Sequence, residues 1–312
     1  MQQIQFLVPE AYDGVSVRGF LRGPCRVSAR LLATCKRLPG GITVAGAARI
    51  ATDHLHAGEI LTLRLPVEQD TLPISPNGAP PLDVLYADDA MVAVNKPAGM
   101  ILYARAGQLT GTLRDVALDY FRAHQEPLVF HPLYRLDRDT TGVVLLARDR
   151  YAASAVPETV QKVYGAVCEG TFSGSGTITK PIGPEPGSKV RQCVRADGRP
   201  AITHWRALAS ARGHTLVVCR LETGRTHQIR VHMASCGHPL AGDDFYGGSR
   251  EWIARQALHC GWAAFRSPDA GPVTVEVPLP EDFQNLLVSL QLPTPHFQAE
   301  AQRWQTEDKA QK

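Results

Sequence analysis

One carboxylate in the sequence has surroundings suited to chemistry. Asp137 lies in the segment HPLYRLDRDTTG, between Arg135 and Arg138 and shortly before the apolar run VVLLAR. Cations beside a carboxylate favour its ionised form, and a loop side chain is free to meet a substrate. Asp137 is therefore predicted to act as a base or a nucleophile. From these residues alone, a structural ion pair between arginine and aspartate is the alternative.

Two other groups of residues have weaker chemical patterns. His227, His232 and His238 follow the spacing H-x4-H-x5-H, which matches no common zinc pattern, and no cysteine pair lies nearby. The segment GTFSGSGTITKPIG is rich in glycine but lacks both common nucleotide-binding loop patterns. We therefore expect neither a metal site nor a nucleotide-binding loop.

Apolar periodicity predicts the elements that must position Asp137. A T-x-x-D capping box at Thr112 begins one helix, and a second short helix follows Pro280 and runs through Leu290. The expected strands after the first helix are 143–147, 162–168, 215–221, 258–265 and 273–277. Strands and helices do not alternate regularly, so an α+β fold with a mixed, largely antiparallel sheet is predicted over residues 83–292.

The first 66 residues are predicted to form a separate small unit. Ser16 and Ser28 are expected to cap two short helices, and ITVAG and EILTLRLP read as strands that pack beneath them. Positions 18–37 contain six basic and no acidic residues: Arg18, Arg22, Arg26, Arg30, Lys36 and Arg37. Such an uncompensated cluster is typical of a phosphate-binding face. Residues 67–82, with four prolines, read as a linker, and 293–312 read as a polar tail.

Length and composition exclude several classes of protein. The chain has 312 residues, 44% hydrophobic and 20% charged, with a net charge of +3, as expected for a globular protein. It contains no apolar run long enough to span a bilayer, and its N-terminus lacks the pattern of a secretory signal. The seven cysteines are widely spaced without a C-x-x-C, which argues against a disulfide framework. A cytoplasmic protein is therefore expected.

Several motifs in a fixed order resemble one enzyme family. YRLDRDTTG resembles the H-R-L-D-x-x-T-S-G motif of the RluA-type pseudouridine synthases, which isomerise uridine in ribosomal and transfer RNA. VNKPAGM, KVYGAVCEG, LETGRTHQIRVHMASCGHPLAGDDFYGG and LHCGWAAF resemble further blocks of that family, in family order over residues 83–280. The N-terminal unit, with G-I-x-V-x-G after two basic helices, is similar to an S-four-like RNA-binding domain.

The resemblance implies a reaction and a set of roles. The bond from the sugar to the uracil nitrogen breaks and a bond to ring carbon five forms, after the nucleotide has flipped out of its stack, with no metal or organic cofactor. Asp137 is then the catalytic carboxylate, and Arg135 occupies the gap left by the flipped base. The other implied contacts to the substrate are Tyr164, which stacks on uracil, Arg225, which pairs with Asp137, and Leu258, an apolar contact at the uracil.

The resemblance also marks departures and residues outside the site. Tyr134 and Tyr103 stand where the family usually has histidines, and we expect the two tyrosine rings to pack together. The run containing Asp243 and Asp244 is structural in the family, so neither is assigned to the site. Without the resemblance, Tyr164 and Leu258 read as ordinary core residues of strands.

The predicted partner is RNA, with no membrane and no obligate protein partner. Large-subunit ribosomal RNA is the leading substrate, because an appended S-four-like domain is common among family members that act there. Transfer RNA is the first alternative. A catalytically silent RNA-binding or ribosome-assembly factor is the second, supported only by the two tyrosine departures.

Overall fold

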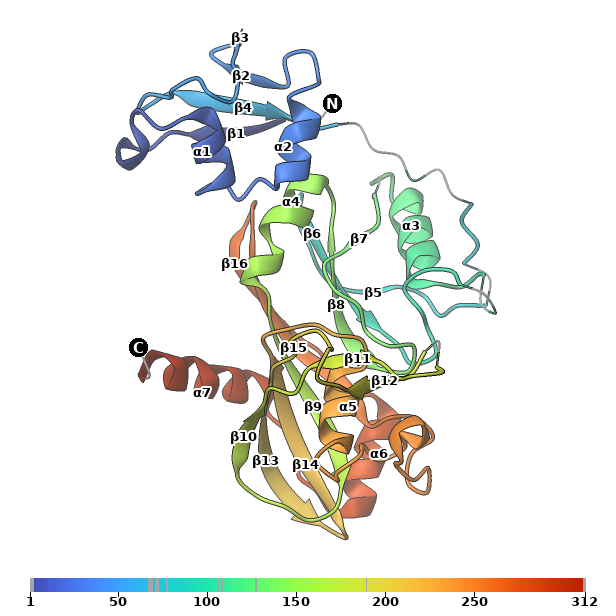
Figure 1. The fold of residues 1–312 in the computed structure, drawn as a ribbon. Coiled ribbons are helices and arrows are strands. Elements are labelled where there is room, and N and C mark those ends of the chain that lie inside the picture. The colour runs from blue at the N-terminus through green and yellow to red at the C-terminus, as the bar shows by residue number, and fades with distance from the viewer. Residues whose placement is uncertain are drawn as a thin grey trace.

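The computed structural model describes residues 3–310, except 67–69, 71, 72, 77, 106, 108, 127 and 189. A small N-terminal unit, residues 3–66, lies above a long sheet that the rest of the chain builds (Figure 1). The two parts have separate hydrophobic cores. Within the described part of the chain, no helix has the length and apolar character needed to cross a membrane.

The N-terminal unit forms the helices and strands that its sequence predicts. Helix α1 (Val17–Arg22) begins at Ser16 and α2 (Ala29–Cys35) begins at Ser28, and each serine hydroxyl accepts a backbone N–H at 3.1 Å. Such caps satisfy N–H groups that the first helical turn leaves unpaired. The antiparallel sheet has the order β1-β4-β2-β3, with β1 (Gln3–Leu7), β2 (Ile42–Val44), β3 (Ala47–Ala48) and β4 (Ile60–Arg64). Sheet and helices share one core.

The larger sheet is mixed and largely antiparallel, as predicted. Its order is β10-β13-β14-β9-β15-β8-β6-β5, with β16 paired to β15 and β7 to β8. Among the described strands, β8 and β15 form the only parallel pair. The strands are β5 (Asp83–Ala87), β6 (Met91–Lys96), β7 (His131–Pro132), β8 (Thr141–Ala147), β9 (Gln161–Glu169), β10 (Ser175–Ile178), β13 (Thr203–Ala211), β14 (His214–Leu221), β15 (Leu258–Ser267) and β16 (Gly271–Glu276). A separate hairpin pairs β11 (Ile182–Pro184) with β12 (Gln192–Val194).

Alternate residues of the central strands face two different layers. On β9, Tyr164 and Ala166 belong to the core that includes residues of α3 (Leu113–Ala123), α4 (Arg150–Ala155) and α5 (Gln228–Ala234). Val163 and Val167 belong to the core beneath α6 (Glu281–Leu290) and α7 (Phe297–Ala310). The period of two in a strand makes this division, and it places Tyr164 on the same side of the sheet as α5.

The C-terminal segment differs from the predicted polar tail. Residues 297–310 form helix α7, with Phe297, Ala301 and Trp304 buried against the sheet. Arg220 on β14 donates two hydrogen bonds to Asp308, at 2.5 and 3.0 Å. The segment is mostly polar, but its apolar residues recur at helical spacing, and basic side chains on the sheet bind its acidic ones. This combination holds it in place.

The predicted linker lies partly outside the described residues, and its described part is attached to the larger unit. Asp70 forms an ion pair with Arg114 of α3, and the Gly111 N–H donates to the Ser75 carbonyl at 2.8 Å. Ile74, Ala79 and Leu82 pack against the larger core. These described residues therefore belong to the packing of α3.

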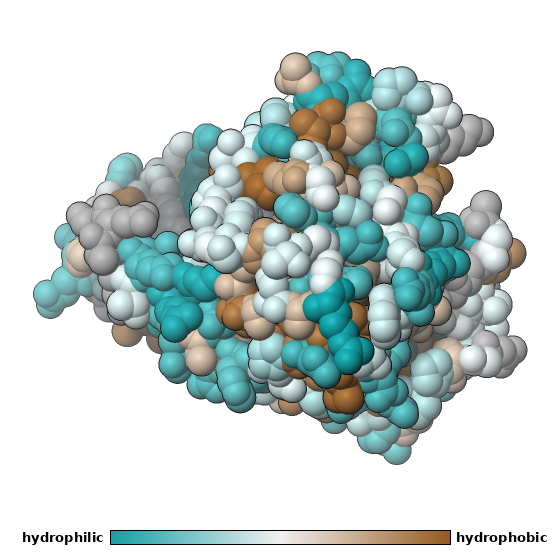
Figure 2. Space-filling model, turned by 90° about the horizontal axis from the view of Figure 1, so that it is seen from below, coloured by the Kyte–Doolittle hydropathy of each residue, from teal (hydrophilic) through white to brown (hydrophobic). Residues whose placement is uncertain are grey.

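The two units also touch directly, where α2 and α4 lie next to each other (Figure 1). The Ser28 N–H donates to the Ser154 hydroxyl at 3.4 Å, and the rings of Phe6 and Tyr151 meet edge to face at 5.5 Å. On the face seen in Figure 2, hydrophobic residues lie in small separate groups among hydrophilic ones.

Candidate active site

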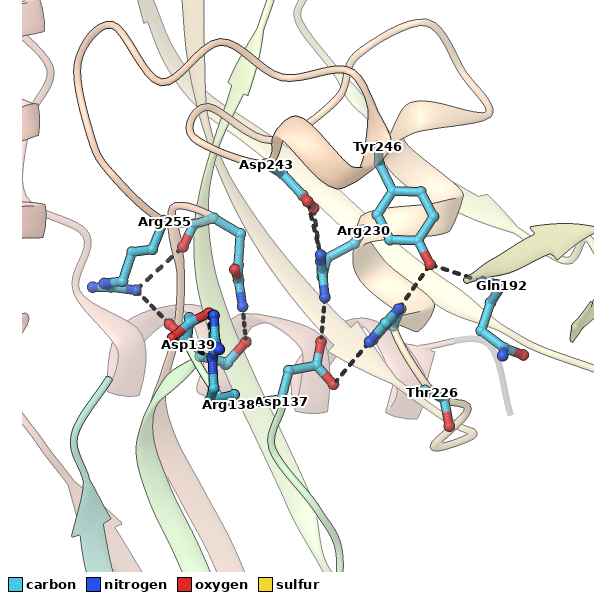
Figure 3. Close-up of polar contacts among 12 residues, drawn as sticks. Asp137, Arg138, Asp139, Gln192, Thr226, Arg230, Asp243, Tyr246 and Arg255 are labelled. Atoms are coloured by element: carbon cyan, nitrogen blue, oxygen red, sulfur yellow. Dashed lines mark hydrogen bonds and ion pairs between the residues drawn. The ribbon is translucent and has the colours of Figure 1, made fainter. Parts of the chain in front are cut away.

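The loop that carries Asp137 is fixed by bonds to its backbone. Lys96, at the end of β6, donates to the Arg138 carbonyl at 2.8 Å, and Arg255 donates to the Asp139 carbonyl at 3.0 Å. Gly142 ends the loop at φ +113°, where a Cβ atom would lie 2.2 Å from the Cys260 carbonyl oxygen. Only glycine allows β8 to approach β15 this closely. The loop is therefore held on both sides, and Figure 3 shows the contact from Arg255 to Asp139.

Lys96 is fully buried and binds three carbonyl oxygens. Its Nζ lies 2.8 Å from the oxygens of Pro97, Met100 and Arg138, which match the three N–H donors of an ammonium group. Burial lowers the pKa of Lys96 to about 7, while the charges of Asp139 and Asp137 oppose that shift. The lysine thus joins the β6 turn to the loop of Asp137.

Lys96→Met is expected to destabilise the protein by about 2–4 kcal/mol, because three carbonyl groups lose their donor. Urea unfolding followed by circular dichroism measures this change. Lys180→Met, at an exposed lysine bound to Ser235, is the matched control and should change the unfolding free energy by less than about 0.5 kcal/mol. Equal stability of the two variants would contradict the anchoring role of Lys96.

Asp137 is bound by an arginine that a second carboxylate holds in place. Arg230 of α5 donates from Nη1 to Asp137 at 3.0 Å, and from Nε and Nη2 to Asp243 at 2.7 and 2.8 Å. Burial alone would lower the pKa of Arg230, but these two carboxylates keep it raised. Asp243 is 1% exposed and Arg230 is 6% exposed. Asp243 therefore fixes the guanidinium, and the guanidinium orients the Asp137 carboxylate (Figure 3).

A histidine and a tyrosine complete this network. The Tyr246 hydroxyl accepts the Gln192 N–H at 3.0 Å and lies 2.7 Å from Nδ1 of His227. The Tyr246 hydroxyl can donate to Nδ1 or accept a hydrogen bond from it, and Nε2 of His227 lies 3.9 Å from Asp137. Burial lowers the pKa of His227 and raises that of Tyr246 to about 12. An imidazole whose pKa is lowered by burial therefore lies next to the carboxylate.

A cleft of about 430 Å³ opens beside Asp137. Tyr164 and Leu258, 4% and 5% exposed, line it from β9 and β15. Arg135 is exposed, lines the same cleft, and donates to the Thr226 hydroxyl at 3.3 Å. With Asp137 and Arg225, which also line it, the structure brings all five predicted site residues to one cavity.

The predicted pairing of Arg225 with Asp137 is wrong. Arg225 lines the cleft, but its Nε donates to the Pro200 carbonyl at 2.8 Å, and Arg230 is the residue that binds Asp137. Arg225 lies in the turn before α5, whereas Arg230 lies within the helix on its buried side. Sequence reasoning also left Asp243 outside the site and considered His227 only as a metal ligand. Both Arg230 and His227 lie in the block TGRTHQIR, which resembles a block of the family, and this resemblance could have indicated them as site residues.

The expected contact between Tyr134 and Tyr103 is absent from the ring contacts of the described residues. Tyr103 meets the ring of Phe130 at 5.2 Å. Tyr134 donates from its hydroxyl to the Val143 carbonyl at 3.0 Å, and its ring carries the Lys162 ammonium group 3.9 Å from the centroid. The two tyrosines therefore have separate roles.

The three histidines considered as metal ligands have different surroundings. His227 lies at the cleft, and His232 is buried between the Thr203 hydroxyl and the Lys180 carbonyl. His238 lies 3.0 Å from the Glu169 carbonyl. Each imidazole is thus engaged in its own set of protein contacts.

The six basic residues predicted to form a phosphate-binding face are all exposed. Two of them bind nearby carbonyl groups: Arg22 donates to Val27 at 2.8 Å and Arg37 to Ala33 at 3.1 Å. The exposed set comprises Arg18, Arg22, Arg26, Arg30, Lys36 and Arg37. This unit therefore presents an uncompensated positive surface on α1, α2 and the turns that follow them.

Comparisons with known proteins identify the family of this chain. The family model for RNA pseudouridylate synthase matches residues 90–235. Ribosomal large subunit pseudouridine synthase D of Xanthomonas campestris is 38% identical over 263 residues, 76% of this chain and 77% of that protein. An uncharacterised RNA pseudouridine synthase of Bacillus subtilis, YjbO, is 35% identical over 274 residues, 85% of this chain and 96% of that protein.

Solved structures share the fold. Human RNA pseudouridylate synthase domain containing 4 superposes with a TM-score of 0.56 at 24% identity, covering 69% of this chain and 95% of that one. Human RNA pseudouridylate synthase domain containing 1 gives 0.52 at 24% identity, covering 72% and 100%. These structures show the fold, and the sequence relatives show the family: the chain belongs to the RluA-type RNA pseudouridine synthases, and it is an isomerase.

Proposed function

We propose that this pseudouridine synthase modifies large-subunit ribosomal RNA in the cytoplasm, with Asp137 as its catalytic carboxylate. One observation carries the site assignment: Asp137 lies at a cleft, held by Arg230, with Tyr164 and Leu258 on the walls. The ribosomal target is supported by the names of several relatives, including synthase D of Xanthomonas campestris and of Neisseria meningitidis. Transfer RNA is the alternative substrate.

The proposed reaction begins with a uridine flipped out of its stack. Exposed Arg135 at the cleft fills the gap in the RNA, which offsets part of the unstacking cost of a few kcal/mol. The base lies between Tyr164 and Leu258. Asp137 then attacks the anomeric carbon or removes a proton from the sugar, and the detached uracil turns and rejoins through ring carbon five.

The environment of Tyr164 limits its role in this reaction. Burial raises the pKa of Tyr164 well above its usual range, so its phenol is neutral at physiological pH. A neutral phenol is a poor base, so a stacking contact with uracil is the role that its surroundings favour. Arg225 at the same cleft supplies positive charge toward the RNA backbone.

Mapping pseudouridines in cellular RNA from wild-type and gene-deletion strains tests the function and names the substrate. Loss of a modification in large-subunit ribosomal RNA supports the proposal. Loss confined to transfer RNA supports the alternative. A catalytically silent assembly factor predicts ribosome defects with every pseudouridine retained.

The N-terminal unit is proposed to be an S-four-like RNA-binding domain that holds the RNA backbone. Replacing Arg18, Arg30 and Lys36 by glutamine should weaken RNA binding and lower the slope of log affinity against log salt by about 2 to 3, since each lost phosphate contact contributes about 0.7–0.9. Filter binding at several salt concentrations measures the slope. Arg122→Gln, at an exposed arginine of α3, controls for a general change in charge. An unchanged slope in the triple variant would count against backbone contacts by these residues.

A further inference from the structure

Lys162 is a cation at the cleft that has no acidic partner among the residues the structure describes. It lies two residues before Tyr164 on β9, so both side chains point to the same face of the sheet, and both line the cleft. Among the described residues, no hydrogen bond or ion pair engages its Nζ atom. Its ammonium group lies over the face of the Tyr134 ring, 3.9 Å from the centroid.

The comparison with Lys96 shows what Lys162 lacks. The Lys96 ammonium group is buried with three carbonyl acceptors at 2.8 Å, whereas Lys162 has no acceptor in the described part of the chain. A cation–π contact offsets only part of the cost of removing an ammonium group from water, and burial lowers the pKa of Lys162. Its N–H donors are therefore available to a ligand that enters the cleft and supplies an acceptor.

The surroundings of Lys162 indicate which part of an RNA supplies that acceptor. Cys260 and Tyr164 are its buried neighbours on this face of the sheet, and Tyr134 lies beneath its ammonium group. Two arginines line the same cleft and have other proposed partners: Arg135 the gap left by the flipped base, and Arg225 the RNA backbone. An acceptor beside Tyr164 belongs to the base stacked on that ring, and the acceptors of uracil are its two carbonyl oxygens.

We propose that Lys162 donates a hydrogen bond to a uracil carbonyl oxygen and stabilises the negative charge that forms on the base during catalysis. This inference rests on the proposed function. When the bond between C1′ and N1 breaks, its electron pair stays on the uracil and is shared among N1, O2 and O4. A cation placed at one of these oxygens stabilises the detached base where its charge develops.

The same contact persists through the turning of the base. A half-turn about the axis through N3 and C6 exchanges N1 with C5 and O2 with O4. Lys162 therefore faces a carbonyl oxygen both before and after the rotation. C5 then bonds to C1′ and loses its proton while N1 gains one, so substrate and product have the same atoms.

Lys162→Met tests this role in the full-length protein. The substrate is total RNA from a gene-deletion strain grown with uridine tritiated at carbon five, because tritium is released when C5 bonds to the sugar. The single-turnover rate should fall at least about 100-fold, the loss typical of removing one donor to a developing anion. RNA affinity should stay within about threefold, and the melting temperature should not fall, because methionine removes an unpaired cation.

Lys180→Met is the matched control and should retain the wild-type rate. Three results would overturn the inference: an unchanged rate for Lys162→Met, a loss of RNA affinity equal to the loss of rate, or a lowered melting temperature. Absence of tritium release by the wild-type protein is a different result, which rejects the proposed function itself.

A fluorinated substrate provides a second readout that a structural role does not affect. Fluorine at carbon five stabilises the detached anion, so the reaction of 5-fluorouridine should depend less on Lys162. Large-subunit ribosomal RNA transcribed with 5-fluorouridine is incubated with each protein. After C5 bonds to C1′ it carries fluorine and has no proton to lose, so the bond between N1 and C6 takes up water, with the hydroxyl on C6 and the proton on N1. Mass spectrometry follows this hydrated, carbon-linked product as it replaces 5-fluorouridine. Lys162→Met should lower the rate on 5-fluorouridine, relative to the wild-type protein, by a factor at least ten times smaller than its factor on uridine. An equal defect on both substrates would exclude charge stabilisation by Lys162.

Discussion

Asp137→Asn is expected to lower the rate of pseudouridine formation by about 10⁴-fold or more. Losses of this size follow removal of a group that acts directly on the reacting atoms. Asparagine keeps the shape of the side chain but supplies neither a nucleophile nor a base. Single-turnover tritium release from RNA labelled at carbon five of uridine measures the rate, and the same variant should fail to restore modification in the deletion strain.

The fold and the RNA affinity of this variant should be preserved. In this variant Arg230 keeps both of its hydrogen bonds to Asp243, so the unfolding free energy should stay within about 2 kcal/mol of the wild type. Asp244→Asn is a matched control, since Asp244 is exposed and pairs with Arg250. An Asp137→Asn protein that formed pseudouridine at the wild-type rate would assign the chemistry to another group.

Local patterns were sufficient to predict much of the fold. The caps at Ser16, Ser28 and Thr112 begin helices in the structure, because a cap acts on N–H groups two or three residues away. The predicted strands form for a similar reason, since their apolar residues suit a buried sheet. Helix α7 was missed because its mostly polar composition hides the spacing of Phe297, Ala301 and Trp304, and its partners lie about 90 residues earlier on the sheet.

Site residues were predictable where a single sequence segment identifies them. Asp137 and Arg135 lie in one loop, and Tyr164 and Leu258 each lie in a strand that forms as expected. The partner of Asp137 was not predictable in this way, because Arg225 and Arg230 are five residues apart in one block. Arg230 binds Asp137, which lies 93 positions earlier in the chain, because of where helix α5 packs. Local sequence patterns do not predict that packing.

The anchoring of Arg230 leads to the second large expected effect, Arg230→Met. This change leaves Asp243, 1% exposed, without its arginine, and an uncompensated buried charge should cost about 3–5 kcal/mol of unfolding free energy. It also frees the Asp137 carboxylate, and misplacement of a reacting group by about 1 Å can cost 10²-fold in rate. Urea unfolding and single-turnover tritium release measure the two losses.

The double variant Arg230→Met/Asp243→Asn separates the two effects of Arg230. Asparagine removes the buried charge, so most of the lost stability should return, while the rate should stay about 10²-fold low because Asp137 still lacks its guanidinium partner. Asp243→Asn alone should weaken the hold on Arg230 and lower the rate by a smaller factor. If the double variant recovered rate together with stability, Arg230 would be a residue of the fold alone. Recovery of stability without rate identifies Arg230 as the residue that positions the Asp137 carboxylate and Asp243 as the residue that holds Arg230.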